Sequence, residues 1–410
     1  MIGEESSQGE TTLPHAAGGP PARVILNPRE ERRVLRGHRW VFSNEIDRIE
    51  GDPAPGTVVE VVRQDGRLVG LGHFNPDTLI AVRLLTDRRE AIDRAFLAGR
   101  LRRALRLRQR LYPGARSFRL VHGESDDLPG LIVDKYEDCL AVQTLSRGMD
   151  LLLSTVCDAL EEVLRPRGIV ERNESMLRER EGLPHRSGVL RGDPPPEVEL
   201  TEGDLRFAVR LLSGHKTGFF FDQRENRLAL RRFAPGARVL DAFCHDGAFG
   251  LHLAGAGAEA VLGVDVSAEA VQAAQANARL NGLEDRCQFE ARDAAAALDL
   301  LHAGSERFDI VVLDPPSFTR TRKNVPAAKR GYEEVNRKAL RVLKRGGILA
   351  TASCSFHITD ETFLGCVHEA AVRTQRTLRL LEWRSQAPDH PILPAMPETR
   401  YLKFGIFEAD

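Results

Sequence analysis

The sequence predicts an α/β protein in which a Rossmann-like, doubly wound parallel sheet follows a small β-rich domain and a small α/β domain. Three observations support this prediction. The chain has 410 residues, enough for two to four domains at about 100 to 200 residues each. Apolar residues make up 42% and charged residues 29%, the balance of a soluble globular protein. After Arg238, short apolar runs alternate with helical patterns, as in a parallel sheet covered by helices on both faces.

The N-terminal part divides into a leader and a β-rich domain. Residues 1–21 are rich in Gly, Pro, Ser and Glu, so we expect a disordered leader. They lack the order of a signal peptide, and no apolar run approaches the ~18 residues of a membrane span, so we expect a cytoplasmic protein without a membrane segment. Residues 22–87 hold four β-type runs separated by turn dipeptides such as Asp65-Gly66, which predicts a small β domain.

Residues 88–196 are expected to form a small α/β domain. The stretch from Arg88 to Arg119 has a helical apolar face and eleven arginines against Glu90 and Asp93, a local charge of +9. This charge suits a solvated helix face and a nucleic-acid contact equally well. Strand-like runs and one helical pattern follow. The stretch 179–197 contains three consecutive prolines and is expected to be a boundary.

Residues 197–410 are expected to form a hairpin and then the doubly wound sheet. Alternating apolar residues on both sides of Glu202-Gly203-Asp204 predict the hairpin. The expected strands lie near residues 238–243, 260–266, 288–293, 308–314 and 346–354, with a helix over 362–373. The six cysteines form no C-x-x-C pair, which argues against a disulfide scaffold and a thiolate metal site, so no metal is expected.

Carboxylates follow the ends of the expected strands, at Asp241, Asp265, Asp293 and Asp314. These ends line one crevice in a doubly wound sheet, and collected carboxylates suit a ligand with hydroxyl and amino groups better than one with phosphates. The turn 243–247 also lacks the G-x-G-x-x-G spacing of a dinucleotide site. The pattern therefore suggests a nucleoside cofactor, S-adenosylmethionine. For any single Asp, helix capping is the alternative.

Two motifs point to a reacting centre at the same crevice. In Asp314-Pro315-Pro316-Ser317-Phe318 the prolines end the strand sharply, which fixes the carboxylate at the crevice mouth. Asp314 could bond the amino group of a base and Phe318 could stack on it, although a core Phe is an equal alternative. Cys354 ends the expected strand 346–354 and could be a nucleophile, although lone cysteines are more often buried filler.

On these motifs, the chain resembles the rRNA large subunit methyltransferase I family, class I S-adenosylmethionine-dependent enzymes that make 5-methylcytosine in large-subunit (23S) ribosomal RNA. The resemblance covers the chain from Arg23 onward. It includes GHRWVF at 37–42, in a PUA-type RNA-binding domain, DDLPGLIVD at 126–134, in a central domain, and the highly specific KTGFFFDQRENR at 216–227.

The resemblance, together with local charge, gives each motif residue an expected role. Cys354 would be the nucleophile and Asp314 would meet the target base. The cofactor would be held by Asp241, Phe243, Gly247, Asp265, Asp293, Asp222, Gln223 and Arg224. The RNA would be held by Lys216, Pro315, Phe318, Arg320, Arg322 and Lys323. Two departures stand out. Ala242, His245 and Asp246 replace family residues in the first cofactor motif, and Pro316 and Ser317 stand where the better-known RNA cytosine methyltransferases have a second cysteine.

The expected chemistry begins with addition of Cys354 to C6 of cytosine, because C5 alone is a poor nucleophile. The cytosine must be unstacked to enter the site. Ten Lys or Arg residues between Arg320 and Arg345 favour ribosomal RNA as the partner. A homodimer stays open. The alternatives are methylation of a guanine or amino nitrogen in RNA without Cys354, and a non-catalytic RNA-binding protein.

Overall fold

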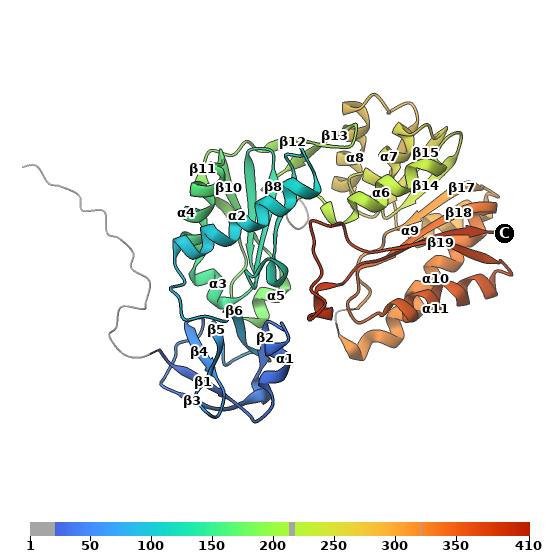
Figure 1. Cartoon of the computed structure of the whole chain (residues 1–410). Coiled ribbons are helices and arrows are strands. Elements are labelled where there is room, and N and C mark those ends of the chain that lie inside the picture. The colour runs from blue at the N-terminus through green and yellow to red at the C-terminus, as the bar shows by residue number, and fades with distance from the viewer. Residues whose placement is uncertain (1–20, 213–217, 320) are drawn as a thin grey trace, which may run out of the picture.

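The computed structural model describes residues 21–212, 218–319 and 321–410, which form three larger sheets and one separate hairpin (Figure 1). Lys216, Arg320 and nearly all of the expected leader lie outside these ranges. Within them, no helix combines the length and the apolar character that crossing a membrane requires.

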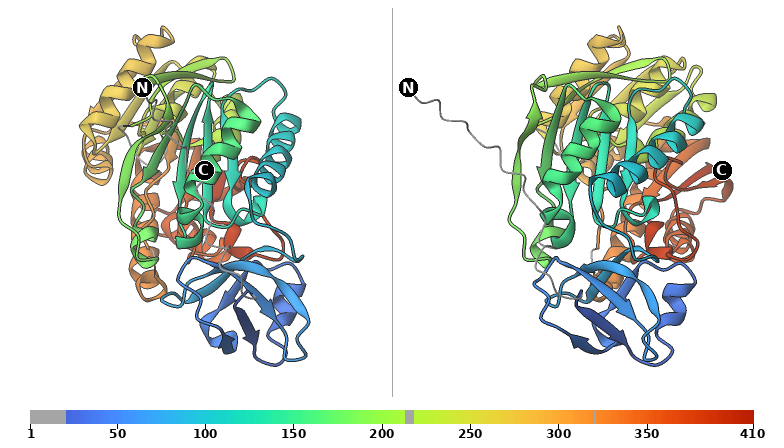
Figure 2. Two further views of the ribbon diagram at one scale, coloured as in Figure 1. Left: turned by 90° about the vertical axis from the view of Figure 1, so that its left-hand side faces the viewer. Right: turned by 60° about the vertical axis from the view of Figure 1, so that its left-hand side comes forward.

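The first sheet has six strands in the order β2-β6-β5-β4-β1-β3 and lies at one end of the molecule (Figure 2, blue). The turn between β4 and β5 is made by Asp65-Gly66, where Gly66 has a φ of +79°, a conformation that glycine adopts without strain. Valines on alternating positions, such as Val59 and Val61, are fully buried in its core. The elements are β1 (Arg23–Leu26), α1 (Glu31–Leu35), β2 (Trp40–Phe42), β3 (Ile46–Glu50), β4 (Val58–Val62), β5 (Leu68–Phe74) and β6 (Ile80–Thr86).

The second sheet has five strands in the order β11-β10-β9-β8-β7. Asp93 caps its long basic helix by accepting a hydrogen bond from the Phe96 amide at 2.9 Å, and the apolar face of that helix packs on α4. The elements are α2 (Arg94–Leu111), β7 (Phe118–His122), β8 (Leu131–Tyr136), β9 (Cys139–Thr144), α3 (Arg147–Leu151), α4 (Leu153–Leu164), β10 (Gly168–Asn173), α5 (Met176–Arg180) and β11 (Arg186–Gly192).

The stretch 179–197 is not only a boundary, because it contains β11. This strand pairs with β10 antiparallel and forms the edge of the sheet, where no second neighbour is required and partly exposed residues are tolerated. The prolines 194–196 follow it, and β12 (Glu197–Glu202) and β13 (Leu205–Arg210) then form the expected hairpin with Glu202 opposite Leu205. The buried face of the hairpin shares one apolar core with the second sheet and the third.

The third sheet has seven strands in the order β16-β15-β14-β17-β18-β20-β19. Its first five strands are parallel, as predicted, and helices cover both faces. The elements are α6 (Arg224–Leu230), β14 (Arg238–Ala242), α7 (Ala248–Gly255), β15 (Ala260–Asp265), α8 (Ala268–Leu280), β16 (Cys287–Ala291), α9 (Ala294–Ala303), β17 (Phe308–Leu313), α10 (Val325–Val342), β18 (Leu343–Ser353), α11 (Asp360–Arg373), β19 (Leu378–Arg384) and β20 (Lys403–Ala409).

The sheet is not parallel throughout. Strand β20 lies between β18 and β19 and is antiparallel to both, with Lys403 opposite Ser353. The two strands β19 and β20 follow the predicted helix over 362–373 and were not expected from the sequence pattern. The loop 385–402 between them reaches the other two units, where Glu398 lies close to His38 and Asp389 accepts from the Arg119 amide.

Candidate functional site

Three carboxylates follow neighbouring strands at one edge of the third sheet. In the register of the sheet, Ala242 lies opposite Val264 on one side and Leu313 on the other. Asp241, Asp265 and Asp314 therefore meet at the carboxyl ends of β14, β15 and β17. Their proximity has an electrostatic effect, because Asp314 and Asp265 both contribute to raising the pKa of Asp241.

Asp241 is buried with one oxygen still open to a ligand. Its side chain accepts a hydrogen bond from the Gly250 amide at 2.8 Å through Oδ2, while Oδ1 has no partner in the described part of the chain. Burial raises the pKa of this carboxyl to about 8. A buried acceptor of this kind suits a donor or cationic group of a ligand, since an unsatisfied buried polar atom is costly.

The loop 243–247 is held in a rare backbone conformation beside Asp241. Phe243 and His245 have φ values of +67° and +50°, a strain that is concentrated at ligand sites, and Gly247 has a φ of +80°, which glycine adopts freely. The His245 amide donates to Asp265 Oδ2 at 3.0 Å, which anchors the loop to the end of β15. A Cβ atom at Gly247 would lie 3.0 Å from Ala274 and from the Phe289 ring, so the loop packs closely on its surroundings.

Asp265 and Asp293 both accept backbone hydrogen bonds. Asp265 is partly buried and also accepts from the Ser267 amide at 2.9 Å, so both of its oxygens are engaged. Asp293 is exposed and accepts from the Ala296 amide at 2.9 Å as the cap of α9, the alternative weighed from the sequence. Its Oδ2 atom has no hydrogen-bond partner among the described residues. Cys244 is buried, and burial raises the pKa of its thiol.

Cys354 differs from the other cysteines in its exposure. It follows the carboxyl end of β18 and is partly exposed, whereas the other five cysteines are buried. Because Thr351 of β18 lies opposite Leu313 of β17, Cys354 and Asp314 follow the ends of neighbouring strands. Cys354 therefore lies near the end of the strand next to β17, where it is partly exposed and also packs against the apolar core, and its role as a nucleophile stays a prediction.

A hydroxyl network joins the Asp314 loop to the Cys354 loop. Ser317 Oγ lies 2.9 Å from Ser355 Oγ, and the Tyr332 hydroxyl lies 2.9 Å from both Ser355 Oγ and Ser353 Oγ. Tyr332 is fully buried on α10. The Ser317–Ser355 contact thus joins the two loops that carry the candidate reacting groups, and the buried tyrosine bonds the Cys354 loop on both sides of the cysteine.

Lys403 and Tyr401 also belong to this site and were missed from the sequence. Lys403 is 4% exposed and donates to the carbonyls of Ser355 at 2.7 Å and Tyr401 at 2.8 Å, so its side chain runs past Cys354. Burial lowers the pKa of Lys403 to about 8, and Cys354 is among the groups whose charge acts on it. Lys403 begins β20 and Tyr401 lies just before it. No local sequence pattern predicts that β20 pairs with β18.

The expected RNA-binding residues occupy different settings. Phe318 packs against Tyr332 with ring centroids 4.6 Å apart, in agreement with the core alternative. Pro315 is buried, and Pro316 is exposed. Arg322 and Lys323 are exposed in a short turn ahead of α10.

The segment 219–224 lies between the second and third sheets. Asp222 accepts a hydrogen bond from the Tyr401 hydroxyl at 2.7 Å, and Gln223 accepts one from Asn226 at 2.6 Å. Arg224 is turned toward the hairpin and the second sheet, where it donates to Glu202 at 3.1 Å and the Ser117 carbonyl at 2.7 Å. Its side chain is therefore not placed to close over the cofactor. Phe219 and Phe221 are buried as packing residues, while Phe220 meets the His245 ring with centroids 4.9 Å apart.

The basic helix α2 is largely neutralised by its neighbours. Glu162 pairs with Arg94 and Arg102, and Asp127 pairs with Arg100 and Arg103 at 3.1 and 3.0 Å. Arg108 is fully buried against Asp126. Most of the +9 local charge therefore serves the fold.

Comparison with known proteins identifies the family. Family models for a PUA-like domain and a methyltransferase domain match residues 24–87 and 234–389. The chain is 40% identical over 387 residues to ribosomal RNA large subunit methyltransferase I of Shewanella denitrificans, covering 93% of this chain and 98% of that protein. The enzyme of the same name from Aeromonas hydrophila is 38% identical over 388 residues, with coverage of 93% and 98%. The chain belongs to the ribosomal RNA large subunit methyltransferase I family.

Solved structures show the same fold. A protein of Streptococcus mutans described as a SAM-dependent methyltransferase superposes with a TM-score of 0.81 at 19% identity, covering 94% of this chain and 99% of that one. The methyltransferase SMU.776, solved with S-adenosylhomocysteine (SAH), gives 0.82 at 20% identity, with coverage of 94% and 99%. As a member of this family, the protein is an S-adenosylmethionine-dependent ribosomal RNA methyltransferase with a PUA-like domain.

Proposed function

We propose that the protein methylates carbon 5 of a cytosine in large-subunit ribosomal RNA, with Cys354 as the nucleophile. The observation that carries this proposal is the position of Cys354. It is partly exposed at the end of β18, beside the Asp314 loop and tied to that loop through Ser355 and Ser317. A nitrogen methyltransferase would have no need of a thiol there.

The residues at the strand ends fit S-adenosylmethionine. The open, buried Oδ1 atom of Asp241 suits the ammonium group of its methionine part, next to the loop that runs from the strained Phe243 to Gly247. Asp265 suits the ribose hydroxyls, and Asp293 the adenine amino group. Asp222 and Gln223 are assigned to the cofactor as well, because they follow Phe220, whose ring meets that of His245 in the same loop. When bound, the cofactor supplies an electrophilic methyl group.

In this proposal Cys354 is the nucleophile and Asp314 orients the base. The Cys354 thiolate forms a bond to C6, and the electron pair of the C5–C6 double bond is thereby made available at C5. Asp314 accepts from the amino group of the cytosine and orients the ring. Once C5 carries the methyl group, loss of the C5 proton restores the double bond and expels Cys354. The buried ammonium group of Lys403 beside Cys354 favours the thiolate, because a nearby cation stabilises that form.

The RNA would reach this site past the loop that follows Asp314. Pro315 fixes the course of the loop, and Phe318 holds it against Tyr332. The exposed cations Arg322 and Lys323 suit phosphate groups that flank the unstacked base. Lys216 and Arg320 lie outside the described residues and keep their expected role in holding the RNA.

A covalent trap tests the nucleophile. Ribosomal RNA carrying 5-fluorocytosine cannot lose a proton from C5, so with S-adenosylmethionine it should form a stable adduct that maps to Cys354. The variant Cys354→Ala should lose both the adduct and methylation, by about 10³-fold or more, and keep its affinity for SAH.

The matched control is Cys157→Ala, which changes a buried cysteine of α4 far from the crevice. It should keep both the adduct and the activity. If Cys354→Ala still methylates RNA at close to the normal rate, the target is a nitrogen atom and the carbon mechanism is wrong. If the wild-type protein and Cys157→Ala both fail to transfer methyl groups to RNA, the protein binds RNA without modifying it.

A further inference from the structure

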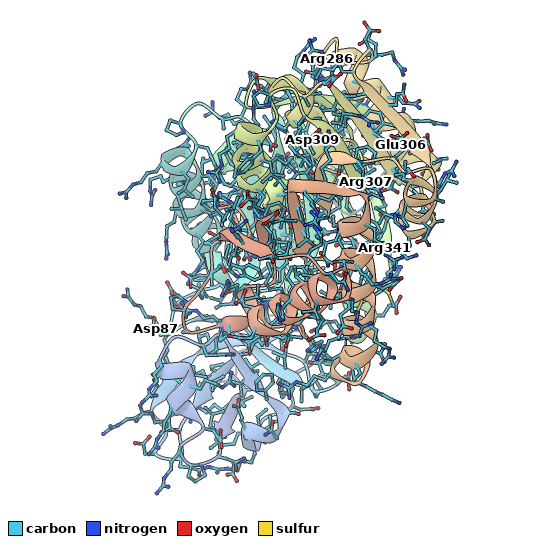
Figure 3. All side chains as sticks on the ribbon, turned by 90° about the vertical axis from the view of Figure 1, so that its right-hand side faces the viewer. Asp87, Arg286, Glu306, Arg307, Asp309 and Arg341 are labelled. Atoms are coloured by element: carbon cyan, nitrogen blue, oxygen red, sulfur yellow. The ribbon has the colours of Figure 1, made fainter. Side chains whose placement is uncertain are left out.

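A basic hollow lies at the edge of the third sheet opposite the candidate crevice. It forms where β17 and β18 begin and where α10 and α11 end, and its volume is about 600 Å³. Its charged lining consists only of cations among the described residues: Arg307, Arg341, Lys344, Arg345, Arg373 and Arg376. Figure 3 shows Arg307 and Arg341 close together on this outer face.

Four of these six cations have no carboxylate partner among the described residues, and one of the four, Arg376, is bonded to backbone carbonyls instead. Lys344 pairs with Asp309 at 2.9 Å and Arg373 with Glu333 at 3.6 Å. Arg307, Arg341 and Arg345 have no carboxylate within ion-pair distance in the part of the chain that the structure describes. Single unpaired arginines also occur elsewhere on the surface, but here three of them line one hollow without an acidic residue in its lining, which suits an external anion.

Arg376 makes the floor of the hollow rigid. Its guanidinium donates to the carbonyls of Leu340, Leu343, Lys344 and Ala409 at 2.8 to 3.0 Å. These bonds tie the ends of α10 and β18 to β20 around a cation. Burial and the charge of Arg345 both lower the pKa of Arg376, so an anion bound here would relieve repulsion between the two.

Helix α10 connects the hollow to the candidate reacting centre. It begins just after the exposed Arg322 and Lys323, ends at Val342 beside the hollow, and has 18 residues, or about 27 Å of helix. Arg330 and Arg341 are exposed and lie on one face of the helix, while Arg337 between them pairs with Glu334 at 2.6 Å. Exposed cations therefore lie at both ends of α10, with Arg322 and Lys323 ahead of its first turn and Arg341 beside the hollow.

We propose that the hollow binds phosphodiester groups of the ribosomal RNA, as a second anchoring site that α10 links to the reacting centre. The cations lie at several separate positions, so the ligand must carry several negative charges along its length. The phosphate groups of an RNA backbone meet this requirement. The site would hold RNA that flanks the target nucleotide. The proposal rests on an RNA substrate and is independent of the carbon-5 chemistry.

A paired charge reversal tests this proposal. Arg341 and Arg345 are both exposed, so Arg341→Glu/Arg345→Glu should fold normally. Its affinity for a transcript of the large-subunit RNA should fall about tenfold or more. The salt dependence of that affinity should also become shallower by about 1.4 to 1.8 in log–log slope, since each lost phosphate contact removes about 0.7 to 0.9. Affinity for a single-stranded RNA of about four nucleotides should change little, because at about 3.4 Å per nucleotide such an RNA is shorter than α10 and spans only one site.

The matched control is Arg279→Glu/Arg286→Glu. Both arginines are exposed and have no ion pair among the described residues, and Arg286 lies apart from the hollow in Figure 3. This control changes the net charge by the same amount and should leave the affinity for the transcript within about twofold.

Equal losses in both double variants, or no loss in either, would overturn the proposal. Equal loss for the long and the short RNA would also overturn it, because the hollow would then act as part of the crevice. If the glutamate variant unfolds, Arg341→Gln/Arg345→Gln should show the same pattern at about half the size. A failure of Cys354→Ala to lose activity would leave this comparison unaffected.

Discussion

Lys403 is buried next to Cys354 with its ammonium group bonded to two carbonyls, at the end of the strand that pairs with β18. Below pH 8 it carries a positive charge, and above this value burial makes it neutral, because its pKa is lowered to about 8. In the proposed reaction the charge favours the thiolate of Cys354, so the benefit should depend on pH.

We therefore expect Lys403→Met to lower kcat by about tenfold or more, equivalent to about 1.4 kcal/mol, with a smaller change in KM for RNA. The loss should be largest below pH 8 and should shrink above it, where the wild-type lysine is neutral as well. Methylation rates of both proteins on the two sides of pH 8 provide the test. A ratio that stays constant with pH would indicate that Lys403 only supports the fold.

At the scale of elements, the hairpin β12–β13 is fixed to α6 and α7 by one buried carboxylate. Glu202 accepts from Arg227 at 2.6 Å and Arg224 at 3.1 Å, and the His252 ring lies 3.1 Å away. Burial alone would raise the pKa of Glu202, but Arg227 and His252 outweigh it and hold the pKa well below its usual range. Two buried arginines thus depend on this single anion.

Replacing Glu202 with Gln should lower the free energy of unfolding by about 3 to 5 kcal/mol, because Arg224 and Arg227 would remain buried without a counter-ion. The difference should be complete above pH 4.5, the usual pKa of the group, and should shrink as the pH falls below it. Urea unfolding at several pH values would show this.

Asp204 offers a control two residues away on the same hairpin. Its side chain is 60% exposed and pairs with Arg231. Because exposed ion pairs contribute little, Asp204→Asn should cost about 0 to 1 kcal/mol. Equal costs for the two substitutions would contradict the role given to burial.

The elements also show what local patterns can predict. The parallel strands β14, β15 and β17 follow from their apolar runs, and the convergence of Asp241, Asp265 and Asp314 follows from the rule that parallel strands end at one edge. Strand β20 could not be placed, because its position between β18 and β19 depends on pairing across 50 residues. Tyr401 and Lys403 were therefore missed. Arg224 was misplaced because its partners lie on other elements.

At the scale of the whole molecule, the loop 385–402 touches all three larger units. His38 of the first unit lies 3.5 Å from Glu398, and the Arg119 amide of the second donates to Asp389 at 3.0 Å. The Ala387 amide donates to the Asp222 carbonyl at 2.8 Å, next to the third sheet. The same loop leads directly into Tyr401 and Lys403. The PUA-like unit and the candidate reacting centre are thus joined by one continuous segment.

Removing the Asp389 side chain should weaken this connection. The two tryptophans of the chain, Trp40 in the PUA-like unit and Trp383 on β19, report on opposite ends of it. In single-tryptophan backgrounds their unfolding transitions should coincide in the wild type and separate in Asp389→Ala, with a loss of about 1 to 3 kcal/mol.

The control variant is Asp158→Ala, which removes an exposed carboxylate instead of a buried one. This substitution should leave the two transitions together and shift stability by less than about 0.5 kcal/mol. Transitions that remain coincident in Asp389→Ala would show that the shared apolar core, and not this loop, couples the units.

The interior position of β20 has a consequence for how the protein is made. As the chain emerges during synthesis, the earlier strands can associate at once, but β18 must wait for residues 403–409 with one side unpaired. A nascent chain halted before that point would already display its RNA-binding surfaces while lacking Lys403 beside the sulfur. Methylation would thus begin only after residues 403–409 have been synthesised and have paired with β18. A partly synthesised chain would bind ribosomal RNA without methylating it.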